Sequence, residues 1–393
     1  MVLFNDLPSE LISTVLEIVD LRSLLSTAVV ASSLQYPSER LIYHTVKFRI
    51  FYGCPYEASA VPAQQAFLQS VSSSERRARY VDLLSLQEIN CEGEDEMAMF
   101  QNLERAMKLM ANLKKLSVIG IPYIRHAHLE SPTFSLTHLS LQPACPNGVP
   151  NPNEILVPIM RAHPELRGLS LQGVWSLPEG DIVAVEEQNS DAQPSAVLCP
   201  RLESVDSDGE EILQSLLVGR FVKRLILTRK TEKAGEKWGS LSMLPGYSHL
   251  EALVVFIDMQ KLSQNTLPIM MARHLVSLTR LNVRCMQFDR DRRSVVPSYI
   301  PDPLILSIAQ IQSLESLTLS TTTEWSTSQA ASKQKGMVHF LYKSCPRLKE
   351  MFVKSSHGHN SHSHYGARGN LIGMVAASMA NKKEDILVFM PSR

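Results

Sequence analysis

The sequence predicts an α/β fold in which a short helical head precedes a long solenoid of parallel β-strands alternating with helices, curved into a horseshoe. Three observations predict it. Apolar residues follow helical spacing near the N-terminus, a strand-like apolar unit recurs later about every 30 residues, and 393 residues exceed one ordinary domain of ~100–200 residues. We therefore expect a head at 1–48, a connector at 49–78 and a repeat array at 79–393.

The head is expected to contain three short helices. Two apolar stripes follow helical spacing along the first helix: Leu11, Val15 and Ile18 on one face, and Ile12, Leu16 and Val19 on the next. Ser23 is expected to cap the second helix, and Pro37 to interrupt the helical pattern before the third. A helix that only covers a core needs one stripe, so the second stripe either packs on the body or meets a partner.

The body carries ten copies of a unit of the form L-x-x-L-x-L, typical of leucine-rich repeats of irregular length. The copies begin at Val81, Leu113, Leu136, Leu166, Leu202, Val222, Leu250, Leu278, Leu314 and Leu348. Helical segments are expected between the strands, and three of them end in a proline junction at His163-Pro164, Cys199-Pro200 and Cys345-Pro346. Proline cannot continue a helix or donate in a sheet, so it fits the turn from helix to strand.

Polar residues between the leucines favour an array with one exposed sheet face over an ordinary α/β domain, whose strands would be apolar on both faces. Because side chains alternate along a strand, these residues are expected to form an outward surface that binds a protein. The candidate substrate-facing positions are Lys115, Ser117, His138, Ser140, Ser170, Arg224, Arg280, Asn282, Ser316 and Thr318. Gly168 and Ile226 share the same outward register.

Composition excludes several functions. Lys and Arg (39) balance Asp and Glu (39), which argues against a nucleic-acid binder and a polybasic membrane clamp. No apolar run reaches the ~20 residues that span a bilayer, and acidic residues near the N-terminus argue against a secretory leader. The six scattered Cys include no C-x-x-C pair, so we expect a reduced, intracellular chain, cytoplasmic or nuclear, without a metal site or cofactor. Nucleotide-binding, hydrolase and metalloprotease motifs are absent, so catalysis is not expected.

The head also resembles an F-box over roughly residues 3–48. The resemblance rests on Leu7-Pro8-Ser9-Glu10-Leu11, then Val15-Leu16 and Ile18, then Leu24-Leu25 with Val29-Val30, and finally Leu41-Ile42-Tyr43-His44-Thr45-Val46. It departs at Val30-Ala31-Ser32-Ser33-Leu34, where many F-boxes carry V-C-R-x-W. The body is similar to the irregular leucine-rich repeats found behind F-boxes in large fungal families.

This resemblance implies a non-catalytic adaptor of an SCF (cullin–RING) ubiquitin ligase. The head would dock on the Skp-type linker subunit, and the repeats would hold an unknown protein substrate. The residues implied in linker binding are Leu7, Pro8, Leu11, Val15, Leu16 and Ile18, with Leu24, Leu25 and Val29 supporting or extending the contact.

Two alternatives remain open at the level of sequence. The chain could be a leucine-rich-repeat scaffold unconnected with ubiquitin, its head serving only as an N-terminal cap. More weakly, four His within residues 357–364 could make it a metal-responsive binding protein, although the Gly, Asn and Ser between them are typical of a loop that fixes no ligand geometry.

Overall fold

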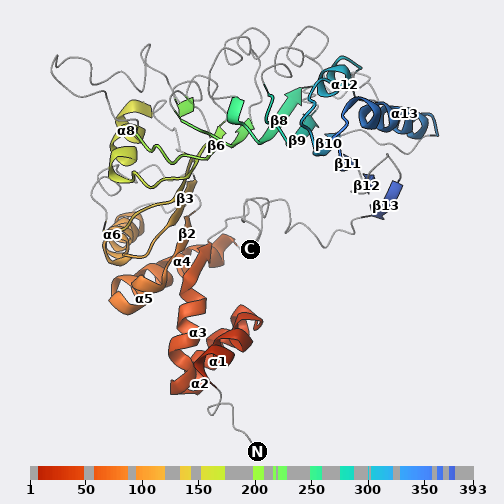
Figure 1. Cartoon of the computed structure of the whole chain (residues 1–393). Coiled ribbons are helices and arrows are strands. Elements are labelled where there is room, and N and C mark those ends of the chain that lie inside the picture. The colour runs from red at the N-terminus through yellow and green to blue at the C-terminus, as the bar shows by residue number, and fades with distance from the viewer. Residues whose placement is uncertain are drawn as a thin grey trace, which may run out of the picture. The chain divides into compact units, whose positions relative to one another are not determined.

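The computed structural model has an α/β fold whose strands lie in chain order (Figure 1). It describes residues 8–47, 57–86, 94–119, 133–142, 152–172, 198–207, 216–217, 220–227, 248–258, 275–286, 300, 302–321, 328–355, 361–365 and 371–376. The chain divides into two compact units, Met1–Leu202 and Glu203–Arg393, which are described in turn.

The first unit begins with three helices: α1 (Ser9–Glu17), α2 (Leu21–Val30) and α3 (Ser32–His44). Ile12, Leu16 and Leu24 form a small core, against which Leu41 and other residues of α3 pack. The cap of α2 differs from the expectation, because the carboxylate of Asp20 accepts hydrogen bonds from the backbone N–H groups of Arg22 (3.0 Å) and Ser23 (3.1 Å). Ser23 is thus the third residue of the helix and not its cap.

The expected interruption at Pro37 is also wrong, because α3 runs through this residue without a break. Proline removes one helical N–H donor. The C-terminal half of the helix nevertheless packs Leu41 and Ile42 against the core of the head. It also buries Glu39, which is 5% exposed. These contacts hold the backbone helical on both sides of Pro37.

The rest of the first unit alternates strands with helices. In order these are β1 (Thr45–Lys47), α4 (Glu57–Ser72), α5 (Glu75–Tyr80), β2 (Leu83–Leu86), α6 (Glu94–Leu109), β3 (Lys115–Ile119), β4 (His138–Gln142), α8 (Pro152–Ala162) and β5 (Gly168–Leu171). Each strand pairs in parallel with the next along the chain. Figure 1 shows α5, α6 and α8 on one side of these strands.

The second unit continues the same pattern. Its elements are β6 (Ser204–Ser207), β7 (Arg224–Leu227), β8 (Ala252–Asp258), β9 (Arg280–Met286), α12 (Asp302–Ile308), β10 (Ser316–Thr321), α13 (Ser328–Ser344), β11 (Glu350–Ser355), β12 (Ser361–Tyr365) and β13 (Leu371–Ala376). Strands β6 to β11 are parallel, whereas β12 and β13 pair antiparallel. The sequence did not predict β1, β12 or β13.

All ten strands expected from the repeat unit are confirmed. The first, fourth and sixth positions of every copy are buried, and none is more than 8% exposed. In eight of the ten copies the second position also has a shared role, because its carbonyl accepts two backbone N–H groups from the next repeat. The carbonyl of Glu251, for example, accepts from Thr279 and Arg280, both at 3.0 Å. This bonding places equivalent positions of successive repeats in register.

Two of the proline junctions end their helices as expected, since α8 stops at Ala162 and α13 at Ser344, whereas the residues that precede Leu198 at the third junction lie outside the described ones. The residue before each proline is buried and bonds to a preceding segment. Nδ1 of His163 accepts from the N–H of Leu136 (3.2 Å), and Sγ of Cys199 donates to the carbonyl of Met160 (3.3 Å). These residues therefore fasten one repeat to its neighbour.

Candidate functional site

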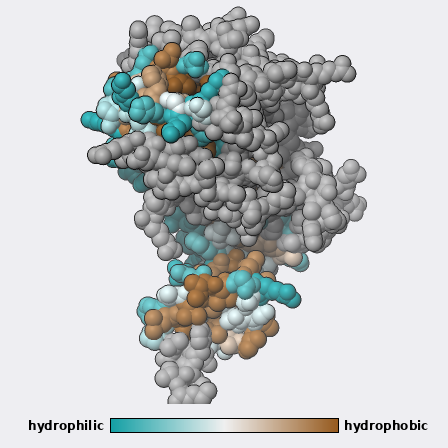
Figure 2. Space-filling model, turned by 90° about the vertical axis from the view of Figure 1, so that its right-hand side faces the viewer, coloured by the Kyte–Doolittle hydropathy of each residue, from teal (hydrophilic) through white to brown (hydrophobic). Residues whose placement is uncertain are grey.

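The helical head exposes a large apolar surface, which we call the head face. It consists of Leu11 (51% exposed), Val15 (38%), Ile18 (85%), Leu21 (59%), Leu25 (51%), Val29 (87%) and Val30 (84%), contributed by α1, the residue that follows it and α2. Figure 2 shows hydrophobic side chains gathered on the surface of the head. Contiguous apolar patches of this kind mark interaction sites in folded proteins.

The structure divides the residues implied in linker binding between the surface and the interior. Leu11, Val15, Ile18, Leu25 and Val29 lie on the head face, and Pro8 is exposed beside it. Leu16 (2% exposed) and Leu24 (7%) lie instead in the core of the head, so they support the head face without reaching its surface. Leu7 lies outside the described residues.

Sequence reasoning missed Leu21 and Val30 as members of the head face. Leu21 precedes Leu25 by one helical turn, a spacing that places both on the same side of α2. The sequence predicts the two stripes of α1 but does not predict which of them is buried. The stripe of Ile12 and Leu16 is buried, and the stripe of Leu11, Val15 and Ile18 is exposed.

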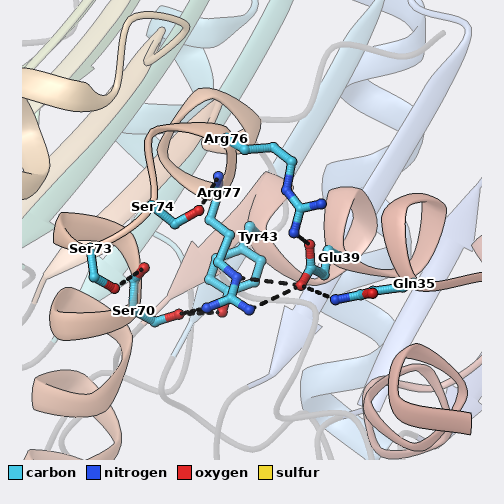
Figure 3. A network of polar contacts seen from close by, with 8 residues as sticks. All are labelled: Gln35, Glu39, Tyr43, Ser70, Ser73, Ser74, Arg76 and Arg77. Atoms are coloured by element: carbon cyan, nitrogen blue, oxygen red, sulfur yellow. Dashed lines mark hydrogen bonds and ion pairs between the residues drawn. The ribbon is translucent and has the colours of Figure 1, made fainter. Parts of the chain in front are cut away.

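The buried carboxylate of Glu39 on α3 joins the head to α5 (Figure 3). Oε2 of Glu39 lies 2.6 Å from Nη2 of Arg76, and Oε1 lies 3.1 Å from Nη2 of Arg77. Nε of Arg77 donates a second bond to Oε1 (3.3 Å), and Nε2 of Gln35 a weaker one (3.4 Å). The Glu39 side chain is only 7% exposed. We call this cluster the Glu39 anchor.

Aromatic contacts extend the Glu39 anchor on both sides. The guanidinium of Arg76 lies over the ring of Tyr36, 4.2 Å from its centroid, in cation–π geometry. The hydroxyl of Tyr43 hydrogen-bonds to Oγ of Ser70 on α4 (2.8 Å). Arg77 also donates to this Oγ (2.9 Å). Since β1 follows α3 directly and pairs with β2, the head is continuous with the start of the sheet.

The outward positions of the first unit fall into rows across the strands. Lys115 is in register with His138, and Ser117 with Ser140 and then Ser170. His138 is exposed, and the others are half-buried. Gly168 is not available as expected, because a Cβ at this position would lie 2.5 Å from the imidazole of His138. The histidine side chain covers this glycine.

The second unit forms equivalent rows. Arg224, Ala252, Arg280 and Ser316 share one register, and Ile226, Val254, Asn282 and Thr318 share the next. Arg224 and Arg280 are exposed, whereas Asn282, Ser316 and Thr318 are half-buried. Ile226 is 7% exposed and contributes little outward surface, contrary to its expected role.

The titratable groups of the described strands and helices give no sign of a reactive thiol or a metal centre. Burial raises the pKa of the Cys285 thiol to about 12 and that of Cys345 to about 11, which keeps both protonated at neutral pH. Within the described ranges, no three His, Cys, Asp or Glu side chains are placed to hold a metal ion. His357 and His359 lie outside these ranges, and His362 and His364 fall in β12.

The described helices also include none that combines the length and apolar character needed to cross a membrane.

The described residues form an α/β protein of repeating strand units with two kinds of candidate docking surface, the head face and the outward strand faces.

Comparison with known proteins does not narrow this class. No family model matches the chain, and no curated protein matches it. A crystal structure of a Bacteroides fragilis protein from a structural genomics programme is similar at 14% identity, over 80% of this chain and 74% of that one, with a TM-score of 0.39. So low a TM-score supports no conclusion about function.

Proposed function

We propose that this chain is a non-catalytic adaptor: its head docks on the Skp-type linker subunit of an SCF ubiquitin ligase, and its repeats bind a protein substrate. The observation that carries the proposal is the exposure of the head face. Seven aliphatic side chains on α1, on the residue that caps it and on α2 are between 38% and 87% exposed, while a second stripe supplies the core. The adaptor would act by proximity, holding the substrate near the ligase without bond chemistry of its own.

The energetics of burial support a docking role. Fully burying one Val, Leu or Ile side chain is worth about 1.5–3 kcal/mol, so the head face offers enough apolar surface for a hydrophobic interface core. It is built on helices and backed by the packed core of Ile12, Leu16 and Leu24. A preformed apolar surface of this kind loses little conformational entropy when a partner binds.

A second candidate function is the leucine-rich-repeat scaffold whose head only caps the array. The Glu39 anchor and the pairing of β1 with β2 favour it, because both fix the head to the first repeats. A cap, however, ends an apolar stack with a polar outer face. The outer face of this head is apolar, which favours docking over capping alone.

The experiment is co-purification of the full chain with a Skp-type linker subunit, followed by titration of the complex. We compare the wild type with Ile18→Asp/Val29→Asp, since these two side chains are the most exposed of the head face. Val276→Asp is the matched control, being an exposed valine (66%) in the second unit. Circular dichroism confirms that each variant is folded.

The wild type and Val276→Asp should bind the linker subunit equally. Ile18→Asp/Val29→Asp should bind at least about 100-fold more weakly, since truncating each central interface residue typically costs more than ~1–2 kcal/mol. Absence of binding by the wild type, or full binding by the folded double variant, would refute the adaptor proposal. In that case the capping function becomes the better account of the head.

A further inference from the structure

The outward face of β7, β8 and β9 combines two exposed arginines with a small residue between them. Arg224 on β7 and Arg280 on β9 are both in register with Ala252 on β8. Neighbouring strands lie about 4.8 Å apart, so the two Cα atoms are separated by roughly 10 Å across the alanine. Side chains of this length can converge on one anionic group above Ala252.

The cations have no partners on their own surface. Among the described residues, neither Arg224 nor Arg280 forms an ion pair. The acidic residues in the outward register of the described strands of this unit are Asp206, which is in register with Ile226, Glu350, which is two strands away from Arg280, and Asp258, which lies at the far end of β8, six residues beyond Ala252. The row formed by Arg224, Ala252 and Arg280 is therefore positive.

An apolar row adjoins the two arginines. Val254, half-buried on β8, is in register with Ile226 on β7 and follows Ala252 by two residues. Two residues of extended chain span about 6.6–6.8 Å, which is also the distance between side chains on the same face of a bound extended peptide. A peptide lying along β8 could therefore place one side chain above Ala252 and the next one above Val254.

We propose that this face, the Arg224–Arg280 clamp, binds an extended acidic segment of a partner protein with an acidic residue and an apolar residue two positions apart. The carboxylate lies between the guanidinium groups of Arg224 and Arg280, which donate charge-assisted hydrogen bonds to it. The apolar side chain packs on Val254, which is half-buried. This inference rests on the proposed function in one respect, since it assigns the substrate-binding role of the repeats to a particular surface.

The test measures binding of a fluorescein-labelled peptide of repeating Glu-Ser-Leu-Ser to the full chain by fluorescence anisotropy. The variant is Arg224→Glu/Arg280→Glu, which reverses both cations of the clamp. The control, Lys335→Glu/Lys343→Glu, makes the same change in net charge at two exposed lysines of α13. A Lys-Ser-Leu-Ser peptide and a single-stranded oligonucleotide of equal charge test the class of ligand.

The wild type should bind the acidic peptide and not the basic one. Reversing the clamp should weaken binding by about tenfold or more for each arginine, whereas the α13 control should change it by less than about threefold. Val254→Ser, which removes the apolar contact, should weaken binding severalfold. Three results would overturn the inference: no binding by the wild type, equal losses in both charge variants, or tighter binding of the oligonucleotide, which would assign the face to nucleic acid.

Failure of this inference is distinguishable from failure of the adaptor proposal. Ile18→Asp/Val29→Asp lies on the head face and should leave peptide affinity unchanged, just as Arg224→Glu/Arg280→Glu should leave linker binding unchanged. If the acidic peptide binds but the linker subunit does not, the Arg224–Arg280 clamp is supported and the adaptor proposal is refuted. If the linker binds and the peptide does not, the adaptor stands and its substrate surface lies elsewhere.

Discussion

Removal of the Glu39 carboxylate should loosen the head from the first repeats. In the variant Glu39→Ala, Arg76 and Arg77 lose the oxygens to which they donate at 2.6, 3.1 and 3.3 Å. The same two arginines also contact Tyr36 and Ser70, so the carboxylate that holds their guanidinium groups in place for these contacts is lost as well. We therefore expect local opening between α3 and α5, because in the wild type this ion-pair cluster links the two helices.

The size of the effect follows from burial. Removing one partner of a fully buried ion pair costs about 3–5 kcal/mol, because the other charge is left without compensation. Here the carboxylate side chain is 7% exposed, but the arginine side chains are 37% and 32% exposed and can turn toward water. We therefore expect a loss of about 2–3 kcal/mol. Glu39→Gln keeps one oxygen acceptor and should lose about half of that.

Native-state hydrogen exchange followed by mass spectrometry is the suitable assay, because it reports the free energy of local opening in a chain of two units. The control is Glu75→Ala, which removes the i,i+4 pair of Glu75 and Arg79, where both side chains are more than half exposed. An exposed ion pair, or an acidic residue in the first turn of a helix, contributes less than about 1 kcal/mol to the free energy of unfolding. Equal changes in α3 and α5 exchange for Glu39→Ala and Glu75→Ala would refute the anchoring role.

Three further predictions test other parts of the structure. Gly168→Ala should destabilise the first unit by about 1–2 kcal/mol in urea denaturation, and His138→Ala should remove most of that cost, because the added Cβ meets the histidine ring; an unchanged cost would contradict the packing. Leu16→Ala should cost about 2–4 kcal/mol and Ile18→Ala below about 0.5, since the first is 2% exposed and the second 85%; similar losses would contradict the assignment of the two stripes. The Cys285 thiol, with its pKa raised to about 12 by burial, should resist alkylation at pH 8 until the chain is unfolded, as mapped by mass spectrometry, and rapid labelling of the native chain would contradict its burial.

The ten strands could be predicted because their signal is local. Each repeat supplies three buried positions within six residues, and these positions alone fix which side chains of the strand face the core. β1 lacks this signal, since Val46 is its one buried residue and its partner, β2, starts at Leu83. The Ser-His composition of β12 is typical of a loop, and its antiparallel pairing with β11 and β13 makes it a strand.

The head face could be predicted in part. Helical spacing identified two stripes on α1, but spacing cannot tell which stripe is buried, because this depends on where α2 and α3 lie. Leu16 and Leu24 were therefore grouped with surface residues although they belong to the core. The Arg224–Arg280 clamp could have been predicted from the positions of its residues within the repeat unit. Both arginines occupy the third position of their copies, and the copy between them has alanine there.

The structure also decides which experiment separates the two functions considered for the head. Deleting the head would distinguish a docking module from a cap only if the module came off without disturbing the repeats. Here α3 carries the Glu39 anchor and leads directly into β1, which pairs with β2. Deletion therefore unfolds the first repeats under either function. Substitutions on the head face leave the anchor intact, so loss of linker binding by Ile18→Asp/Val29→Asp with a folded array is the result that distinguishes docking from capping.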